Sequence, residues 1–290
     1  MAGYLCLSVL LLAALPTPYA SPLSTGSSLR FIALGDWGGV SNPPFHTPRE
    51  VATAKEMGRT VAALGADFIL SLGDNFYYNG VQDVNDKRFQ VESLENFPNY
   101  HYSLKFKVPK SNATVALLMI DTVTLCGNSD DFQSQQPQQP RDVGLARSQL
   151  AWLRKQMAAS RDDYLLVAGH YPVWSVAEHG PTHCLVKYLQ PLLLKYKATA
   201  YLCGHDHNLQ YLQDKAGVGY VLSGAGNFME NSRKHFHQVP AGFLRFFYAA
   251  PASLGGFAYV EIDGKEMSVT YIEASGKSLY KTSLPRRSHL

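Results

Sequence analysis

Four apolar runs in this 290-residue chain end in side chains that can bind metal ions. These side chains are Asp36, Asp74 with Tyr77, His170, and His205 with His207. A single ending of this kind is more often a turn, a helix cap or a core histidine than a metal ligand. Four endings that each follow a glycine favour one shared site, because glycine lets backbone segments approach closely. The carboxyl ends of strands are also where α/β sheets place their ligands.

The six side chains suit two metal ions better than one. Two carboxylates and a phenol favour a hard cation, and three imidazoles suit iron, zinc or manganese. Six ligands exceed the needs of a tetrahedral site, whereas they fit two octahedral-type ions that share a bridging carboxylate. Side chains alternate along an extended chain, so His205 and His207 can reach two adjacent ions. Two ions roughly 3.5–4 Å apart bind a phosphate ester between them and lower the pKa of a bridging water.

The first two runs and the segment between them have the pattern of a β-α-β unit. The strands "LRFIALGDWG" and "DFILSLGDNFY" are predicted to be buried on both faces. A helix is predicted between them, with Thr47 as its cap and Glu50 closing a capping box. Pro48 takes the first helical position and Gly65 ends the helix. Its buried stripe is predicted to be Val51, Ala54, Met57, Val61 and Leu64.

Short apolar runs continue to alternate with helical patterns along the rest of the chain. Strands are predicted in "TVALLMIDTVTLC", "DYLLVAGHYPVWS", "ATAYLCGHDHNLQYL", "GVGYVLSGAGN", "GFAYVEIDG" and "EMSVTYIEASGKSLYKT". Helices are predicted over residues 143–159 and near 184–196. Val143, Leu150, Leu153 and Met157 lie on one face of the first of these helices. The Gln/Pro-rich residues 130–142 are predicted to form an exposed loop. The pattern indicates an α/β fold of two packed sheets with flanking helices, in a single domain over residues 21–290.

The N-terminus and the cysteines indicate an exported protein. Residues 1–20 have the short apolar core and small residues of a secretory signal, and no later segment has the length of a membrane span. Export permits disulfides. Cys203 lies in an apolar strand as a buried thiol, which leaves Cys126 and Cys184 as the expected pair. Asn112 begins a glycosylation sequon. A net charge of +3 with scattered basic residues does not favour nucleic acid.

The motifs "GDWG", "GDNFY", "VAGHYPVWS" and "CGHDHNLQYL" together resemble the purple acid phosphatases, most closely their small mammalian type. The resemblance covers essentially the whole mature chain. It implies a metallophosphoesterase-type four-layer α/β sandwich of two mixed sheets flanked by helices. It also implies a monomeric, secreted or lysosomal acid phosphatase that hydrolyses phosphate monoesters, phosphoproteins among them.

The resemblance also assigns the residues of the site. A ferric ion would bind Asp36, Asp74, Tyr77 and His207, and the Tyr77 phenolate would give a purple colour. The second ion, Fe(II), zinc or manganese, would bind Asp74 as a bridge, His170 and His205. Glu178 and His179 match positions that orient substrate or protonate the leaving group. Cys126 and Cys184 match the family disulfide, and the Gln/Pro-rich loop matches a loop whose cleavage raises activity.

One motif of that family is missing from this sequence. The family has Gly-Asn-His-Asp/Glu on a strand after "GDNFY", where the Asn binds the second metal and the His contacts phosphate. Here only "VESLE" separates "RFQ" from "NFPNYHYSLKF", and about forty residues are absent by the family's spacing. The triplet from Asn99 to His101 is not a substitute, because no apolar strand precedes it. One central strand is therefore predicted to be deleted, with only three protein ligands left for the second metal.

Two functions follow, and a third is disfavoured. The first is an active phosphatase, in which a metal-activated hydroxide attacks phosphorus and Glu178 or His179 acts as the acid. The second is a catalytically impaired chain that binds one metal, either a shortened isoform or a faulty gene model. The missing Asn and His favour the second hypothesis, since losing the His would slow proton transfer by roughly 10²–10⁴-fold. A diester-specific relative is disfavoured because Tyr77 marks the purple type of site.

Overall fold

The computed structural model describes residues 26–81, 83, 86–90, 99–129 and 136–288. Three predicted features fall wholly or partly elsewhere. The signal segment 1–20 lies outside the described residues, as does the junction at 91–98 where the family motif is missing. Of the Gln/Pro-rich loop, only residues 136–142 are described.

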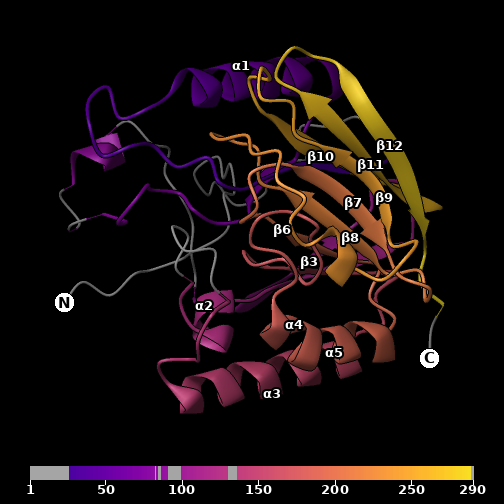
Figure 1. Ribbon diagram of the computed structural model, residues 1–290. Coiled ribbons are helices and arrows are strands. Elements are labelled where there is room, and N and C mark those ends of the chain that lie inside the picture. The colour runs from indigo at the N-terminus through magenta and orange to yellow at the C-terminus, as the bar shows by residue number, and fades with distance from the viewer. Residues whose placement is uncertain (1–25, 82, 84–85, 91–98, 130–135, 289–290) are drawn as a thin grey trace.

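Two mixed sheets form the centre of the fold (Figure 1). The five-stranded sheet has the order β12-β11-β10-β1-β2 and the seven-stranded sheet the order β3-β4-β5-β6-β8-β7-β9. The first contains β1 Leu29–Leu34, β2 Phe68–Ser71, β10 Gly256–Ile262, β11 Glu266–Glu273 and β12 Ser278–Pro285. The second contains β3 Tyr102–Lys107, β4 Thr114–Met119, β5 Tyr164–Ala168, β6 Ala200–Cys203, β7 Leu209–Gln213, β8 Gly219–Ser223 and β9 Leu244–Tyr248.

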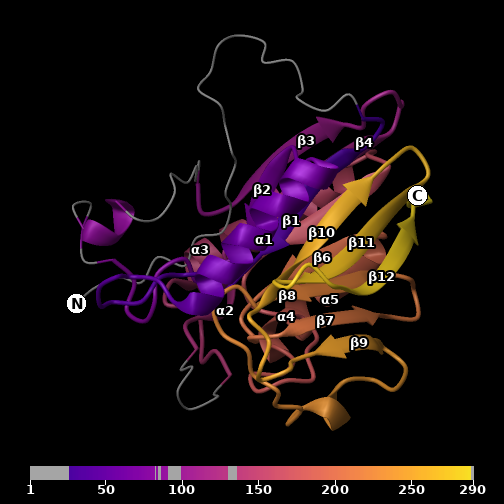
Figure 2. The same ribbon diagram turned by 90° about the horizontal axis from the view of Figure 1, so that it is seen from above.

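Helices cover the outer face of each sheet, which makes four layers. Helix α1 (Pro48–Leu64) lies across the five-stranded sheet (Figure 2). On the other side lie α2 Thr122–Cys126, α3 Val143–Ala159, α4 His183–Tyr188 and α5 Gln190–Lys195 (Figure 1). Short 3₁₀ turns span Lys87–Gln90 and Phe236–Gln238. Buried side chains from both sheets, such as Phe31, Leu117 and Tyr271, fill the space between them. The predicted α/β sandwich is therefore confirmed.

Strand β2 stands at the end of its sheet in the described part of the chain. It pairs in parallel with β1, and Phe68, Leu70 and Ser71 are buried. The ring of Phe68 stacks on Phe106 of β3 in the other sheet, with centroids 5.0 Å apart. The sequence predicts the deleted strand directly after β2 in the chain.

The ends of α1 confirm the predicted capping box. The Thr47 hydroxyl accepts from the Glu50 backbone N–H at 3.2 Å, and the Glu50 carboxylate accepts from the Thr47 N–H at 3.2 Å. The N–H of Gly65 donates to Val61 O and closes the last turn. These reciprocal bonds satisfy backbone groups that a helix otherwise leaves unpaired at its ends.

The predicted buried stripe of α1 is largely wrong. Met57 is buried and Val61 partly so, but Val51, Ala54 and Leu64 are exposed. The buried residues are instead Thr53, Glu56, Met57 and Thr60. Polar side chains can lie on this face because loops meet them there. The Thr53 hydroxyl donates to the carbonyl of Leu254 at 3.2 Å, and Glu56 packs against the turn at Gly276.

Three other predicted elements differ in detail. The run "TVALLMIDTVTLC" is not one strand: β4 ends at Met119, and Asp121 caps the short helix α2 by accepting from the Thr124 N–H at 2.8 Å. The helix near 184–196 is two helices, with Pro191 in the first turn of the second. Helix α3 has the predicted bounds and buries Leu153 and Met157, but Val143 at its start is exposed.

The cysteine prediction is confirmed. Cys126 at the end of α2 and Cys184 in α4 form a disulfide, and Cys203 is a buried free thiol. Burial raises the pKa of the Cys203 thiol well above its usual range. In the described part of the chain, no helix has both the length and the apolar character needed to cross a membrane.

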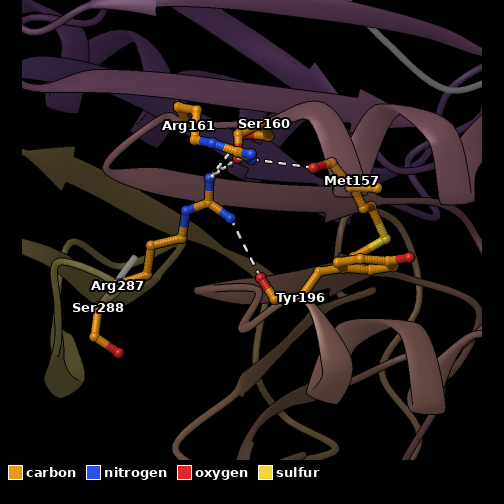
Figure 3. A pocket seen from close by; sticks show the side chains of 7 residues that line it. Met157, Ser160, Arg161, Tyr196, Arg287 and Ser288 are labelled. Atoms are coloured by element: carbon orange, nitrogen blue, oxygen red, sulfur yellow. Dashed lines mark hydrogen bonds between the residues drawn. The ribbon is translucent and has the colours of Figure 1, made fainter. Parts of the chain in front are cut away.

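The C-terminal tail is fixed to the rest of the fold by Arg287 (Figure 3). Its guanidinium donates to the carbonyls of Tyr196 at 3.2 Å and Ser160 at 2.9 Å, and also to that of Asp162. These bonds join the segment after β12 to the ends of α3 and α5. A planar group with five donors suits three carbonyls, of which two lie in the connection after α3 and one follows α5.

Candidate metal centre

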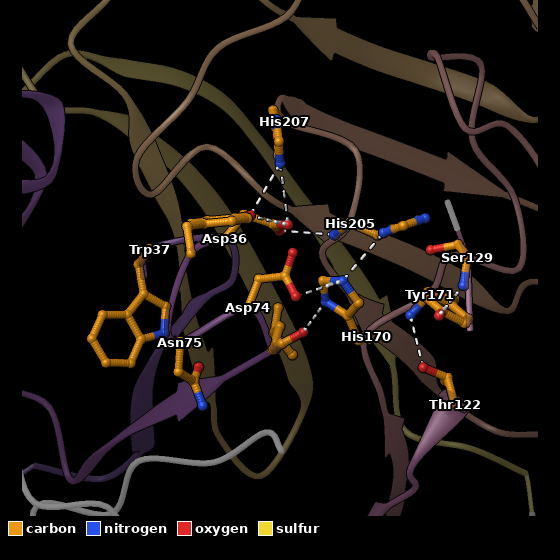
Figure 4. A network of polar contacts seen from close by, with 12 residues as sticks. Asp36, Trp37, Asp74, Asn75, Thr122, Ser129, His170, Tyr171, His205 and His207 are labelled. Carbon is orange, nitrogen blue, oxygen red and sulfur yellow. Dashed lines mark hydrogen bonds and ion pairs between the residues drawn. The ribbon is translucent and has the colours of Figure 1, made fainter. Parts of the chain in front are cut away.

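The six predicted metal ligands converge at one edge of the two sheets: Figure 4 shows five of them, and the Tyr77 hydroxyl lies against Asp36 and His207. Each follows the carboxyl end of a strand. Asp36 follows β1, Asp74 and Tyr77 follow β2, His170 follows β5, and His205 and His207 lie between β6 and β7. Since these strand ends meet where the two sheets pack together, the six side chains share a single site.

One group of ligands consists of Asp36, Tyr77 and His207. The Tyr77 hydroxyl donates to Asp36 Oδ1 at 3.2 Å and lies 3.1 Å from His207 Nε2. His207 Nε2 is 3.6 Å from the same Asp36 oxygen. A carboxylate, a phenol and an imidazole thus present their ligand atoms to one small space, and these are three of the four ligands predicted for the first ion.

A second group consists of Asp74, His170 and His205. His170 Nε2 lies 3.5 Å from Asp74 Oδ1 and 3.2 Å from His205 Nδ1. Ligand atoms of Asp36, Asp74 and His170 all lie within 4.8 Å of one another, so the two groups adjoin. His170 Nδ1 is 2.9 Å from the carbonyl of Leu72. A carbonyl only accepts, so Nδ1 carries the proton and Nε2 keeps its lone pair for a metal.

The backbone is strained at three of these ligands. Asp36, Asp74 and His205 have φ values of 56°, 52° and 73°. This left-handed region is uncommon for residues other than glycine, and strained backbone of this kind clusters at functional sites. Two glycines are needed beside them. A Cβ on Gly73 would lie 2.4 Å from His170 Nδ1, and one on Gly204 would lie 2.3 Å from Asp36 Oδ2.

Burial and neighbouring charges shift the pKa values of the site. Burial raises the pKa of Asp36, although its hydrogen bond with His207 opposes this effect. Burial and the adjacent imidazoles hold the pKa of His205 well below its usual range. Burial also lowers the pKa of His207, but its hydrogen bond with Asp36 and the Asp36 charge outweigh this and raise it to about 9. A neutral His205 is in the form that binds metal.

The donor set fits metal ions. Carboxylates, a phenol and imidazoles approach one another at 3.1–3.6 Å, in places where a cation would satisfy several of them at once. Near His170, the Tyr171 N–H donates to the Thr122 hydroxyl at 3.2 Å, and the Tyr171 hydroxyl accepts from the Ser129 N–H at 3.1 Å (Figure 4). His101 packs on Trp152 of α3, with ring centroids 4.6 Å apart, which agrees with its exclusion as a substitute ligand.

The two predicted acids differ in their surroundings. The His179 ring stacks on His205 with centroids 4.2 Å apart. Its Nδ1 is buried and has no hydrogen-bond partner among the described residues. The Glu178 carboxylate instead accepts from Ser232 and Lys234, each at 2.8 Å. His179 thus adjoins the candidate metal ligands directly, whereas Glu178 accepts hydrogen bonds from another segment.

Sequence reasoning missed Asp206, although it stands inside "GHDH". Its side chain is fully buried, accepts from the backbone N–H of His179 at 2.9 Å, and also accepts from the Ser175 hydroxyl. Residues 205–208 form bends rather than an extended strand, and His205 has a φ of 73°, so the expectation of alternating side chains does not apply here. The hydrogen bonds of Asp206 show that it supports the loop of residues 175–179, and no local sequence signal marks that role.

Comparisons with known proteins identify the family of this chain. The profile of the calcineurin-like phosphoesterase family matches residues 29–209. Human tartrate-resistant acid phosphatase type 5 is 61% identical over 319 residues, covering 97% of this chain and 98% of that protein. Purple acid phosphatase 4 of Arabidopsis thaliana is 27% identical and covers 93% of this chain and 87% of its own length.

Solved structures share the fold at lower identity. GAP50, the anchor in the inner membrane complex of Plasmodium, superposes with a TM-score of 0.74 at 21% identity, covering 91% of this chain and 90% of that chain. Purple acid phosphatase PPD1 from yellow lupin superposes with a TM-score of 0.60 at 15% identity, and the match covers 90% of this chain and 54% of that chain. At these identities the likeness extends to the fold alone.

The human alignment also measures how much of the relative is missing here. It runs over 319 positions, but 97% of a 290-residue chain is about 281 residues, so about 38 aligned positions have no counterpart. That number is close to the deletion predicted from the family's spacing. With 61% identity over nearly its full length, the chain belongs to the tartrate-resistant acid phosphatases of the purple acid phosphatase family.

Proposed function

We propose that the chain is an acid phosphatase that hydrolyses phosphate monoesters at a binuclear, iron-containing site. The observation that supports this most is the convergence of six side chains in two adjoining groups. Asp36, Tyr77 and His207 would hold Fe(III), and His170 and His205 would hold Fe(II), zinc or manganese. Asp74 would bridge the two. Bound ions of this kind offset phosphate charge and lower the pKa of a water at the site.

The chain's own residues supply orientation and proton transfer. The ring of His179 stacks on His205, so a phosphate ester bound beside the metal ligands would lie within its reach. His179 would donate a hydrogen bond to phosphate or a proton to the leaving oxygen. The Leu72 carbonyl keeps His170 in the tautomer that binds metal, and the Tyr77 hydroxyl orients Asp36. These contacts are present before any substrate binds, which avoids reorganisation during the reaction.

A direct assay tests this function. Purified protein with iron restored is expected to release phosphate from an aryl phosphate at acidic pH, and to show a visible absorption band from the Tyr77 phenolate. Metal content is measured in the same sample. Two bound metals without any phosphate release would contradict the proposal. The Tyr77→Phe variant is the control for the colour, because it removes only the hydroxyl that would bind iron.

The deletion supports a second candidate, a catalytically impaired chain that binds one metal. The second ion would keep three protein ligands, Asp74, His170 and His205, and about 38 positions of the human relative are absent. GAP50 has the same fold and is described as an anchor, so the fold alone does not require catalysis. One tightly bound iron per chain, with colour but negligible turnover, would favour this candidate over the first.

We also propose that the chain is exported, glycosylated and monomeric, and is secreted or lysosomal. Residues 1–20 would be its signal, and Asn112 is exposed in the connection between β3 and β4, where a glycan has room. Expression in animal cells is expected to give protein whose mass falls on enzymatic removal of N-glycans. Asn112→Gln is expected to abolish that mass shift. Protein that stays in the cytosol with Met1 intact would contradict the signal assignment.

A further inference from the structure

We propose that the segment of residues 232–235 positions His179, acting through Glu178, and that Glu178 is not the acid. This inference rests on the proposed phosphatase function. The segment lies between β8 and β9, far in sequence from the loop of residues 175–180 that carries both candidate acids. Contacts on two sides of that loop hold His179 in place, together with Gln136, whose Nε2 donates to the carbonyls of His179 at 3.3 Å and Pro181 at 2.9 Å.

The inner side of the loop is fixed by two buried residues that follow β6. Asp206 accepts from the His179 N–H at 2.9 Å, and Gln210 Oε1 accepts from the Val176 N–H at 3.1 Å. Gln210 also donates to the Ser175 hydroxyl at 2.8 Å. Buried polar groups that are all paired restrict a segment to one conformation. The backbone of His179 is therefore set from the side of the metal ligands.

The outer side is fixed by the segment 232–235. Its residues contact three consecutive positions of the loop. The Ser232 hydroxyl and the Lys234 ammonium donate to the two oxygens of Glu178 at 2.8 Å each. The His235 N–H donates to Val176 O at 3.1 Å, and its Nδ1 lies 2.8 Å from Ala177 O.

Gly180 makes this close approach possible. Its φ is +69°, and a Cβ there would lie 2.4 Å from Cγ of His235. A side chain at position 180 would push the segment 232–235 away from the loop and would also strain the backbone. The segment 232–235 therefore packs against the loop without room for a side chain at position 180, which is the residue after His179.

These contacts give the two candidate acids different roles. Both oxygens of Glu178 accept hydrogen bonds, one of them from a charged ammonium, an arrangement that favours the ionised carboxylate. In that form Glu178 has no proton to give to a leaving group. His179 has a buried Nδ1 that no described residue contacts by a hydrogen bond, and its ring stacks on the proposed metal ligand His205. Glu178 is therefore a positioning residue, and His179 is the residue that contacts substrate.

Two substitutions separate these roles. If Glu178 were the acid, Glu178→Gln would lower kcat by about 10²–10⁴-fold and remove one limb of the pH profile. The inference instead predicts a loss of about tenfold or less with both limbs kept, because glutamine still accepts from Ser232. His179→Asn is expected to show the large loss. A large loss with a missing limb in Glu178→Gln would overturn the inference.

The segment itself is tested by removing both of its donors to Glu178. The double variant Ser232→Ala, Lys234→Ala in iron-restored protein is expected to lower kcat about tenfold or less, since Lys234 is exposed and one such pair contributes little. His179 is expected to react with diethyl pyrocarbonate at least about threefold faster, because the loop opens more often. Lys234→Arg in the otherwise native chain should keep native values, and Lys215→Ala, an exposed lysine elsewhere, is the control.

The modification rate of His179 is read by peptide mapping and does not require activity. If the native chain shows no turnover but His179 is modified faster in the double variant than in the native chain, the phosphatase proposal is refuted and the positioning contact stands. An active native chain whose double variant keeps both the native rate of modification and the native kcat would overturn the inference. Thermal unfolding identifies a misfolded variant, and Ser232→Ala alone then provides the milder test with the same two readouts.

Discussion

Asp74→Asn is expected to lower kcat by about 10³-fold or more and to leave at most one metal ion per chain. Asp74 lies within 3.5 Å of His170 Nε2 and within 4.8 Å of the ligand atoms of Asp36 and His170, where it would bridge both ions. The asparagine amide lacks the negative charge that would lie between two cations. A 10³-fold loss in kcat corresponds to about 4 kcal/mol of transition-state stabilisation. Initial rates and metal analysis measure both effects.

Asparagine is the right replacement because it isolates the charge. Asp74 has a φ of 52°, and asparagine is one of the few residues that adopt this left-handed conformation at low cost. The fold should therefore survive, and the melting temperature of the metal-free protein is the check. Asp142→Asn is a matched control, since Asp142 caps α3 away from the site and asparagine caps equally well. Two metals and native turnover in Asp74→Asn would contradict the proposed bridge.

Restoring the missing segment is the second change with a large expected effect. Residues 91–98 would be replaced by the corresponding longer segment of the human relative, which is expected to carry the family's Asn and His. The second metal would regain a fourth protein ligand, and a histidine would again contact phosphate. Turnover is expected to rise by roughly 10²–10⁴-fold, as far as the histidine acts in proton transfer. Phosphate release and metal stoichiometry are compared with those of the native chain.

A matched insert separates length from chemistry. The same segment with its Asn and His both changed to Ala restores the strand but adds no ligand. It is expected to gain stability by giving β2 a neighbour, without a gain in turnover. If the native chain, the full insert and the alanine insert bind the same number of metals and turn over alike, the deletion has no bearing on catalysis.

The convergence of the candidate ligands could be predicted from sequence because four of them directly follow a strong local signal. An apolar run that ends in Gly-Asp or Gly-His predicts a strand and the place where it stops, and Asp36, Asp74, His170 and His205 all follow such runs. The geometry of parallel strands then brings these ends together. The capping box at Thr47 is equally local, and it was confirmed for the same reason.

Features that depend on contacts between distant segments could not be predicted. The buried face of α1 follows the positions of polar groups near Leu254 and Gly276, about 200 residues further along the chain. The pairing of Glu178 with Lys234 joins residues 56 apart. Without that pairing, sequence treats Glu178 and His179 as equivalent acids. Spacing alone contains no information on which of two neighbouring side chains is already engaged.

The left-handed backbone at Asp36, Asp74 and His205 affects which residues are replaced when a member of this family is no longer selected for catalysis. A copy released from selection for catalysis must still fold, and few residues accept that conformation at these positions. Such a copy could retain these three residues for conformational reasons alone. Tyr77, His170 and His207 have ordinary φ values and are free of that constraint. Their retention is therefore the better indicator that a chain still binds metal.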